Sequence, residues 1–198
     1  MRIISGMARG ARLRCLPGLA ARPTLDRVRE SVFSSLGDLR GKVVVDLFAG
    51  SGALGLESLS RGAGRVFFVE NNRRVLRVLR DNVRQVLSYF PDTEGEGVPS
   101  AEILALDARC AGRVLAARAG RVDIALADPP YGGGTGGIPA ADLLADDDFA
   151  DWLGEGLLVL EHDARFRPPW FPTGRWRLLK TRLFGNCAVS FATAHPAV

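Results

Sequence analysis

The sequence predicts an α/β domain with a Rossmann-like, doubly wound and mostly parallel sheet, and three observations support this prediction. Short apolar runs rich in Val and Ile alternate with helical patterns from Lys42 onward, as expected of strands joined by crossover helices. A glycine-rich turn at residues 50–55 follows the first run and precedes a helix. The Gly185-Asn186 pair between the last two runs is a hairpin signal, and it places one antiparallel strand in the sheet.

Seven strands are expected in the main body of the domain, residues 41–198. The run at residues 43–48 shows little alternation of apolar and polar residues, which is typical of a strand buried on both faces. The expected strands are residues 43–48, 65–70, 103–107, 122–127, 156–161, 175–183 and 187–193. The expected helices follow the glycine turn to residue 62 and then occupy residues 72–90, 109–119 and 140–153. Loops are expected at residues 91–100 and 132–137, where Pro, Gly and polar residues gather.

An N-terminal segment, residues 1–40, is expected to precede this body within the same domain. Residues 2–5 and 11–16 have the pattern of short strands around the glycines of residues 6–10, which predicts a small basic β-hairpin. Thr24 is expected to cap a helix with Asp26 in its first turn, where the helix dipole favours an acidic side chain. Apolar residues at helical spacing predict that this helix packs one face on the body. They are Leu25, Val28, Val32, Leu36 and Leu39.

Composition excludes several classes of protein. The chain has 198 residues, of which 47% are hydrophobic and 24% charged, so one globular domain is expected and extensive disorder is not. The longest stretch without Asp, Glu, Lys or Arg is residues 183–198, and Gly, Pro and Asn interrupt it, so no membrane-spanning helix is expected. The chain opens on no secretory leader, which predicts a cytoplasmic protein. Three cysteines without a C-x-x-C pair and two histidines far apart in the sequence predict neither disulfides nor a metal site.

Positive charge is concentrated at the N-terminus and consists almost entirely of Arg. Residues 1–40 hold eight arginines against three acidic residues, whereas the rest of the chain is nearly neutral. Arginine suits phosphates and base edges, which favours a nucleic-acid partner, although a GC-rich genome produces the same excess. The arginines that we expect to contact RNA are Arg2, Arg9, Arg12, Arg14, Arg22 and Arg27.

Two other sets of arginines have a different expected role. Arg29 borders the apolar face of the N-terminal helix and is expected to pair with Asp26, three residues earlier. Four arginines form a stripe on one side of the helix at residues 72–90, away from its apolar side. They are Arg73, Arg77, Arg80 and Arg84. We expect this stripe to be a solvated face, with RNA contact as the alternative.

The glycine turn and the acidic residues near it predict a nucleoside cofactor. Gly50, Gly52 and Gly55 match G-x-G-x-x-G between a strand and a helix, and Glu70 follows Gly50 by 20 residues, where its carboxylate can accept the ribose hydroxyls. This pattern by itself suggests a dinucleotide. Asp46, however, sits at the end of the first strand, where it would repel a pyrophosphate but can hold a cationic amino group.

A third acidic residue extends this series along the sheet. Asp107 ends the predicted third strand and can accept a hydrogen bond from an adenine amino group. Acidic residues at three consecutive strand ends suit S-adenosylmethionine, which has a sulfonium, an ammonium and a ribose but no phosphate. The alternative is that each acidic residue merely caps the following helix, which does not explain the glycine spacing. With the helix N-terminus at Thr24 available for the cofactor's carboxylate, the expected cofactor-binding residues are Thr24, Asp46, Phe48, Gly50, Gly52, Glu70 and Asp107.

The fourth strand ends in the sequence Asp128-Pro129-Pro130-Tyr131, which predicts a catalytic site. Consecutive prolines form a stiff turn without backbone donors, so its carbonyl groups point outward as acceptors. The Asp128 carboxylate and the Pro129 carbonyl can then hold both hydrogens of an exocyclic amino group, while a flipped base stacks on Tyr131. An exocyclic amino nitrogen is not basic, so such a site must supply orientation and charge stabilisation. The alternative is a plain turn at a strand end.

These motifs, in this order, resemble those of class I S-adenosylmethionine-dependent methyltransferases that act on amino groups. The N-terminal motifs at residues 2–6, 9–10, 17–18 and 22–30 are similar to those of the RsmD family. The resemblance covers essentially the whole chain. It implies transfer of a methyl group to the exocyclic N2 of a guanine in 16S ribosomal RNA, without metal, by a protein that we expect to be monomeric and to act on a small-subunit particle.

Two alternatives remain at this point. The Asp-Pro-Pro-Tyr motif also occurs in enzymes that methylate the amino group of adenine in DNA or RNA, although 198 residues leave little room for a domain that reads duplex sequence. A non-catalytic RNA-binding assembly protein on the same fold is the other alternative. The sequence leaves open which guanine is methylated, and whether the substrate is free RNA or an assembled subunit.

Overall fold

The computed structural model describes residues 1–16, 26–91, 98–130, 139–170, 172 and 174–195, and it contains the predicted α/β domain. Seven strands form one sheet in the order β3-β2-β1-β4-β5-β7-β6. The strands are β1 (Val43–Leu47), β2 (Arg65–Val69), β3 (Ser100–Leu104), β4 (Ile124–Ala127), β5 (Leu157–Asp163), β6 (Trp176–Phe184) and β7 (Cys187–Ala194). The helices are α1 (Asp26–Leu36), α2 (Ala53–Ser60), α3 (Arg73–Leu87), η1 (Ala108–Cys110), α4 (Ala111–Arg118), α5 (Pro139–Leu144) and α6 (Asp147–Leu153).

The direction of the strands confirms the predicted sheet. Strands β1 to β5 pair in parallel, and β7 is antiparallel to both of its neighbours, β5 and β6. The chain moves from β1 outward to β2 and β3, and then returns to the other side of β1 with β4. This reversal leaves a crevice at the carboxyl ends of β1 and β4, which is the place where open α/β sheets bind ligands.

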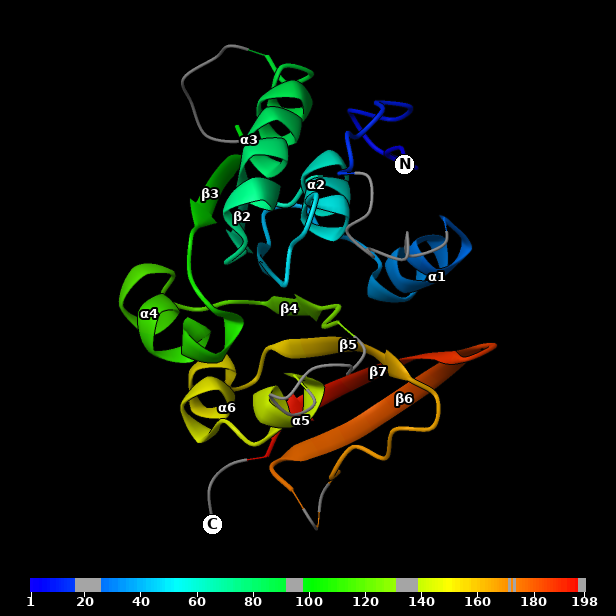
Figure 1. The fold of residues 1–198 in the computed structure, drawn as a ribbon, viewed down its shortest axis with the longest axis vertical. Coiled ribbons are helices and arrows are strands. Elements are labelled where there is room, and N and C mark those ends of the chain that lie inside the picture. Colours follow the sequence, from blue (N-terminus) through cyan, green and yellow to red (C-terminus); the bar gives the residue numbers. More distant parts are fainter. Residues whose placement is uncertain (17–25, 92–97, 131–138, 171, 173, 196–198) are drawn as a thin grey trace.

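Helices cover both faces of the sheet. Figure 1 shows α1, α2 and α3 on one side and α4, α5 and α6 on the other. The side chains of β1 alternate between the two resulting cores: Val44 packs with α1 to α3, whereas Val45 and Leu47 pack with α4 to α6. This alternation explains the near absence of polar residues in β1, because a strand with period 2 between two helical layers is buried on both faces. None of the described helices is both long and apolar enough to cross a bilayer.

Two predicted elements of the body were wrong in their boundaries. The third strand spans Ser100–Leu104 instead of residues 103–107, because its pairing with β2 runs from Arg65 opposite Ser100 to Val69 opposite Leu104. The helix expected at residues 140–153 is two helices, α5 and α6. The chain is extended at Asp146, whose carboxylate accepts a hydrogen bond from Phe149 N at 3.0 Å and so caps α6.

The two N-terminal segments pair in antiparallel as predicted, but over a shorter stretch than two full strands. Residues 2–5 and 11–16 contain one isolated antiparallel bridge, Arg2 with Arg12, in place of two strands. Around this bridge Ile3 N donates to Ala11 O at 2.9 Å and Leu13 N donates to Met1 O at 3.0 Å, whereas other backbone donors of the segment bind buried side chains of α2. Ile4 N and Ser5 N donate to the Glu57 carboxylate at 2.7 and 3.0 Å, and Ala8 N donates to Ser60 Oγ at 3.0 Å. The first 16 residues are therefore held against α2 by its polar side chains.

Helix α1 confirms the predicted pairing of Arg29 with Asp26. Arg29 Nη2 lies 2.8 Å from Asp26 Oδ1 and also donates to the Arg2 carbonyl at 2.6 Å. Arg29 is fully buried instead of bordering the apolar face, and this burial lowers the pKa of its guanidinium. One side chain thus joins α1 to the start of the chain. The predicted cap, Thr24, lies outside the described residues.

Candidate active site

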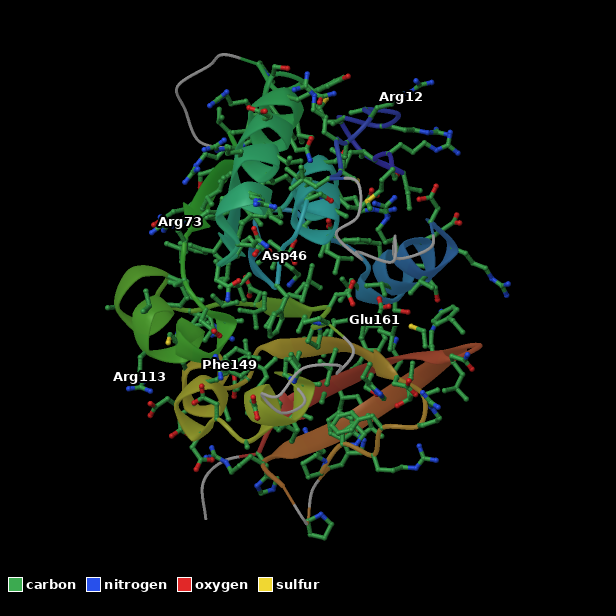
Figure 2. The ribbon with its side chains drawn as sticks, viewed as in Figure 1. Arg12, Asp46, Arg73, Arg113, Phe149 and Glu161 are labelled. Carbon is green, nitrogen blue, oxygen red and sulfur yellow. The ribbon has the colours of Figure 1, made fainter. Side chains whose placement is uncertain are left out.

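A cavity of about 770 Å³ lies at the carboxyl ends of the central strands. Its wall includes the glycine turn after β1, the residues after β2, β3 and β4, and parts of α5 and β5. The predicted site residues at this wall are Asp46, Phe48, Gly50, Glu70, Asp107, Asp128, Pro129 and Pro130. The volume is within the usual range for sites that enclose a small-molecule ligand. Figure 2 shows Asp46 near the centre of the molecule, between the two helical layers.

The glycines of the turn have different physical roles. Gly50 adopts a φ of 57° at the cavity, and a Cβ there would meet only the Phe48 carbonyl oxygen, at 3.8 Å. Gly52 has a φ of 88°, and a Cβ there would lie 2.7 Å from Leu79 of α3. A Cβ on Gly55 would lie 2.3 Å from the ring of Phe68, so this glycine allows α2 to pack closely on β2. Gly50 is thus the glycine nearest to a ligand, and the other two serve packing.

Phe48 is a non-glycine residue in the left-handed region. Its φ is 60°, and its half-buried side chain lines the cavity just after β1. A bulky residue in this region stores backbone strain, which persists where the surrounding structure imposes the conformation and is concentrated at functional sites. The sharp turn directs the chain from β1 into the glycine loop.

Asp46 is a buried carboxyl group of the site with a raised pKa. It is 2% exposed, and its Oδ2 accepts a hydrogen bond from Gly55 N at 2.8 Å. Its pKa is raised to about 7, mainly by burial and also by the negative charges of Asp128 and Glu70, while the Gly55 bond acts in the opposite direction. The surroundings of Asp46 favour the binding of a cation. A positive charge in the cavity would offset the repulsion among the carboxylates of Asp46, Asp128 and Glu70.

Glu70 connects the glycine turn to the start of α3. Its Oε2 accepts from Gly50 N at 2.9 Å, and its Oε1 accepts from Asn72 N at 2.7 Å. The carboxylate also lines the cavity. Since each carboxylate oxygen has two acceptor positions, these bonds orient Glu70 toward the cavity and leave it able to accept hydroxyl groups.

Asp107 lies three residues beyond β3 instead of ending it. Its Oδ1 accepts from Arg109 N at 2.9 Å, so it caps η1, and its carboxylate forms an ion pair with the Arg109 guanidinium at 2.9 Å. These hydrogen bonds lower the pKa of Asp107. The alternative interpretation of a helix cap therefore describes Asp107 correctly, although the residue also lines the cavity.

The residues after β4 bring the predicted catalytic motif to the same cavity. Asp128, Pro129 and Pro130 all line it, with Pro129 buried and Pro130 exposed. The negative charge of Asp128 contributes to the raised pKa of Asp46, so the predicted catalytic carboxylate interacts electrostatically with a predicted cofactor-binding one. Tyr131 and the glycine-rich residues 132–137 lie outside the described residues.

Sequence reasoning did not single out Glu161, which the structure adds to the site. Glu161 belongs to β5 and lines the cavity, and the Cys187 thiol of β7 donates to its Oε1 at 3.3 Å. The residue ends the strand expected at residues 156–161, so extending the rule of acidic residues at strand ends by one more strand would have found it. Asn71 and Leu106 also line the cavity and carried no recognisable signal.

The arginines expected to contact RNA lie at the surface. Arg2, Arg9, Arg12, Arg14 and Arg27 are exposed, and Arg22 lies outside the described residues. Figure 2 shows Arg12 at the periphery, on the side of α2. Two of these arginines have acidic neighbours: Arg2 lies 3.9 Å from Asp26 and Arg14 lies 3.7 Å from Asp81.

The arginine stripe on α3 is also exposed. All four of its members, Arg73, Arg77, Arg80 and Arg84, point away from the core, and Arg84 lies 3.3 Å from Asp81 on the same helix. This arrangement agrees with a solvated face. The stripe provides a second cationic surface against which the N-terminal one can be compared.

The strand order, the antiparallel β7 and the ligand cavity define this protein as a class I methyltransferase. The precorrin-6y C5,15-methyltransferase of Geobacter metallireducens GS-15 has the same fold, with a TM-score of 0.62 at 16% identity, over 99% of this chain and 100% of that chain. At this identity the likeness concerns the fold alone. The chain belongs to the family described as Conserved hypothetical protein 95, whose model matches residues 1–193. This is the RsmD family that the sequence motifs resemble.

Two similar proteins of known name cover nearly the whole chain. The ribosomal RNA small subunit methyltransferase D of Escherichia coli K12 is 32% identical over 190 residues, which are 95% of this chain and 87% of that protein. The protein of the same name from Haemophilus influenzae is 30% identical over 186 residues, which are 93% of this chain and 89% of that protein.

Proposed function

We propose that the protein methylates the exocyclic N2 of a guanine in 16S ribosomal RNA, with S-adenosylmethionine as methyl donor. The names of its two relatives support the substrate, since both are ribosomal RNA small subunit methyltransferases. The observation that carries the proposal is the position of Asp128 and Pro129 in the same cavity as the buried Asp46. One cavity then serves both a cationic cofactor and an amino-group acceptor.

The residues present fit this cofactor. Asp46, whose pKa burial and two neighbouring carboxylates raise to about 7, favours an ammonium or sulfonium group. Gly50 lets a ligand approach the backbone of the turn, and Glu70 is oriented by two backbone donors to accept ribose hydroxyls. Asp107 and Leu106 line the same cavity and are the proposed contacts of the adenine ring. When bound, S-adenosylmethionine supplies an electrophilic methyl group on its sulfonium.

The residues of the Asp-Pro-Pro-Tyr motif orient the base. The Asp128 carboxylate and the Pro129 carbonyl accept the two hydrogens of the guanine amino group, and this turns the lone pair of N2 toward the methyl group. Positive charge develops on N2 during transfer, and the Asp128 carboxylate stabilises it. The proton that N2 loses afterwards passes to the solvent or to Asp128. Tyr131 remains a prediction as the stacking platform.

The N-terminal segment is the proposed contact for the RNA backbone. Arg9, Arg12 and Arg14 are exposed on a stretch of chain that buried side chains of α2 and α3 hold in place. Cations on an anchored segment bind phosphates with a smaller loss of conformational entropy than cations on a free tail. We further infer a cytoplasmic monomer that acts on RNA within a small-subunit particle.

The test is a methylation assay on 16S RNA, with and without small-subunit proteins, followed by mass spectrometry of the nucleosides. We expect N2-methylguanosine, formed faster on the partly or fully assembled particle. N6-methyladenosine from RNA or DNA would contradict guanine as the substrate and support the adenine-amino alternative. Failure to bind S-adenosylmethionine in calorimetry would instead support a non-catalytic RNA-binding protein.

A further inference from the structure

We propose that Glu161 determines the base specificity of this site by accepting the N1–H hydrogen of the guanine. The inference rests on the proposed function, because it concerns the base whose 2-amino group the site is proposed to methylate. It adds a specificity-determining residue that lies on a different strand from the Asp-Pro-Pro-Tyr motif.

The register of the sheet places Glu161 beside Asp128. Strands β4 and β5 are parallel, and Ala127 pairs with Leu160 at the carboxyl end of β4. The next residue on each chain is an acidic one, Asp128 and Glu161, and both line the cavity. Adjacent strands lie about 4.8 Å apart, so two carboxylates at this level serve neighbouring groups of one ligand.

Strand periodicity places Glu161 on the same face as Asp46. Leu126 of β4 pairs with both Asp46 of β1 and Val159 of β5, and paired residues of parallel strands share a face. Glu161 lies two residues beyond Val159 and therefore returns to that face. Figure 2 labels both Asp46 and Glu161, which come from strands on either side of β4.

A residue of the neighbouring strand β7 holds the Glu161 carboxylate in position. The Cys187 thiol of the antiparallel β7 donates to its Oε1 at 3.3 Å, and the residue is half-buried. A carboxylate has about four acceptor sites, so the thiol bond orients the group without occupying it completely. Glu161 is thus an oriented acceptor next to the residue that is proposed to hold the amino group.

The hydrogen-bonding edge of guanine matches this pair of carboxylates. Guanine presents the N1–H donor directly beside its 2-amino group, so two neighbouring donors face two neighbouring acceptors. Adenine and 2,6-diaminopurine present an unprotonated N1 at the same position, and its lone pair would face the Glu161 carboxylate. An acceptor that meets another acceptor in a site closed by the ligand loses its hydrogen bond and is repelled, which is a basis for rejecting the wrong base.

The experiment compares two bases that both have a 2-amino group. Once the methylated guanosine has been mapped, the RNA is prepared with guanosine or with 2,6-diaminopurine riboside at that position, and kcat/KM is measured on both. We expect the wild type to prefer guanosine by roughly 10- to 100-fold. Glu161→Gln should reduce this preference to about threefold or less, because its amide can donate to the unprotonated N1 as well as accept from N1–H.

Asp163→Asn is the matched control. Asp163 lies two residues farther along β5, outside the cavity wall, and its carboxylate forms an ion pair with Arg165 at 2.9 Å. This variant should keep the wild-type preference. A second test variant, Glu161→Asp, retains the carboxylate and should keep the preference for guanosine even where its overall rate falls. Melting temperature and affinity for S-adenosylhomocysteine are measured for each variant.

The two proposals fail in different ways. If the wild type forms methylguanosine but Glu161→Gln keeps the full preference, the role of Glu161 is overturned while the proposed function stands. The same conclusion follows if Glu161→Asp loses the preference, or if Asp163→Asn loses it as fully as Glu161→Gln. If the wild type methylates no guanine, the proposed function fails and the role of Glu161 fails with it.

Discussion

The side-chain amide of Asn82 and the backbone of Arg14 are hydrogen-bonded to each other in both directions. Asn82 Oδ1 accepts from Arg14 N at 2.9 Å, and Asn82 Nδ2 donates to Arg14 O at 3.0 Å. The same Nδ2 donates to Ser51 O, in the glycine turn, at 2.8 Å. Asn82 is fully buried in α3. One amide therefore fixes the proposed RNA-binding segment and the proposed cofactor turn relative to each other.

Replacing this amide should weaken both stability and cofactor binding. Asn82→Ala leaves the backbone groups of Arg14 and Ser51 without their partner, and leaving buried polar groups unpaired costs roughly 1–3 kcal/mol for each group that water does not reach. We expect a lower free energy of unfolding and a weaker affinity for S-adenosylmethionine, measured by chemical denaturation and by calorimetry. Gln85→Ala, at a partly exposed position of the same helix, is the control. Unchanged cofactor affinity in Asn82→Ala would show that Ser51 does not need this bond.

The raised pKa of Asp46 predicts a specific pH dependence. Its pKa is about 7 in the folded protein against an ordinary value of 3.8. Between about pH 4 and pH 7 the folded state holds a proton that the unfolded chain has released, so Asp46 lowers the stability progressively as the pH rises through this window. Asp46→Asn removes this contribution while its amide oxygen still accepts from Gly55 N.

The corresponding measurement is a series of melting curves between pH 4 and pH 8. The variant should be more stable than the wild type at pH 8, and the difference should disappear near pH 4. Binding of S-adenosylmethionine to the wild type near pH 7 should release protons, because a bound cation lowers the pKa of Asp46. Calorimetry in buffers of different ionisation enthalpy detects this release. An equal stability difference at pH 5 and pH 8 would contradict the raised pKa.

Removing the Asp128 carboxylate should separate catalysis from cofactor binding. Asp128→Asn loses the negative charge that is proposed to stabilise the developing charge on N2, and removal of one such group costs about 100-fold or more in kcat. Affinity for S-adenosylhomocysteine should change only a few-fold. The pKa of Asp46 should fall, since the charge of Asp128 is one of the causes that raise it.

A matched variant for this prediction is Asp148→Asn. Asp148 is an exposed residue of α6 that lies 3.2 Å from Arg113, and its loss should leave the rate unchanged. Single-turnover methylation with saturating cofactor gives the rate of transfer directly. A rate for Asp128→Asn close to that of the wild type would mean that this carboxylate does not take part in methyl transfer.

Neutralising the N-terminal arginines should reduce both RNA affinity and its dependence on salt. The triple variant Arg9→Gln, Arg12→Gln and Arg14→Gln removes up to three phosphate contacts, and each contact to single-stranded RNA contributes about 0.7 to the slope of log K against log salt concentration. We therefore expect the slope to fall by about 2, with cofactor affinity unchanged. Filter binding or fluorescence anisotropy across a salt series measures this slope.

The arginine stripe on α3 provides the comparison for this experiment. Replacing Arg73, Arg77 and Arg80 by Gln removes the same charge from an exposed surface of the same protein. This second triple variant should have a smaller effect on the slope than the first. A larger effect would place the RNA over α3 and leave the N-terminal arginines as a consequence of composition.

Features that depend on local sequence were predicted correctly. The apolar runs of β1 and β2, the glycine turn and the hairpin between β6 and β7 each follow from neighbouring residues whose spacing matches a strand or a turn. The placing of Asp46, Glu70 and Asp128 around one cavity follows from a general rule, because the ends of parallel strands meet at one edge of a sheet.

Features that depend on partners distant in sequence required the tertiary structure. The boundaries of β3 follow from its register with β2, and the anchoring of the N-terminal segment follows from Glu57 and Ser60, which accept hydrogen bonds from its backbone. Glu161 is a further example, because it lies beside Asp128 only through the pairing of Ala127 in β4 with Leu160 in β5. The sequence by itself thus determined which elements form and the kind of chemistry at their ends. Tertiary structure decided which polar groups meet, because a hydrogen bond between residues far apart in the chain depends on the register and packing of whole elements.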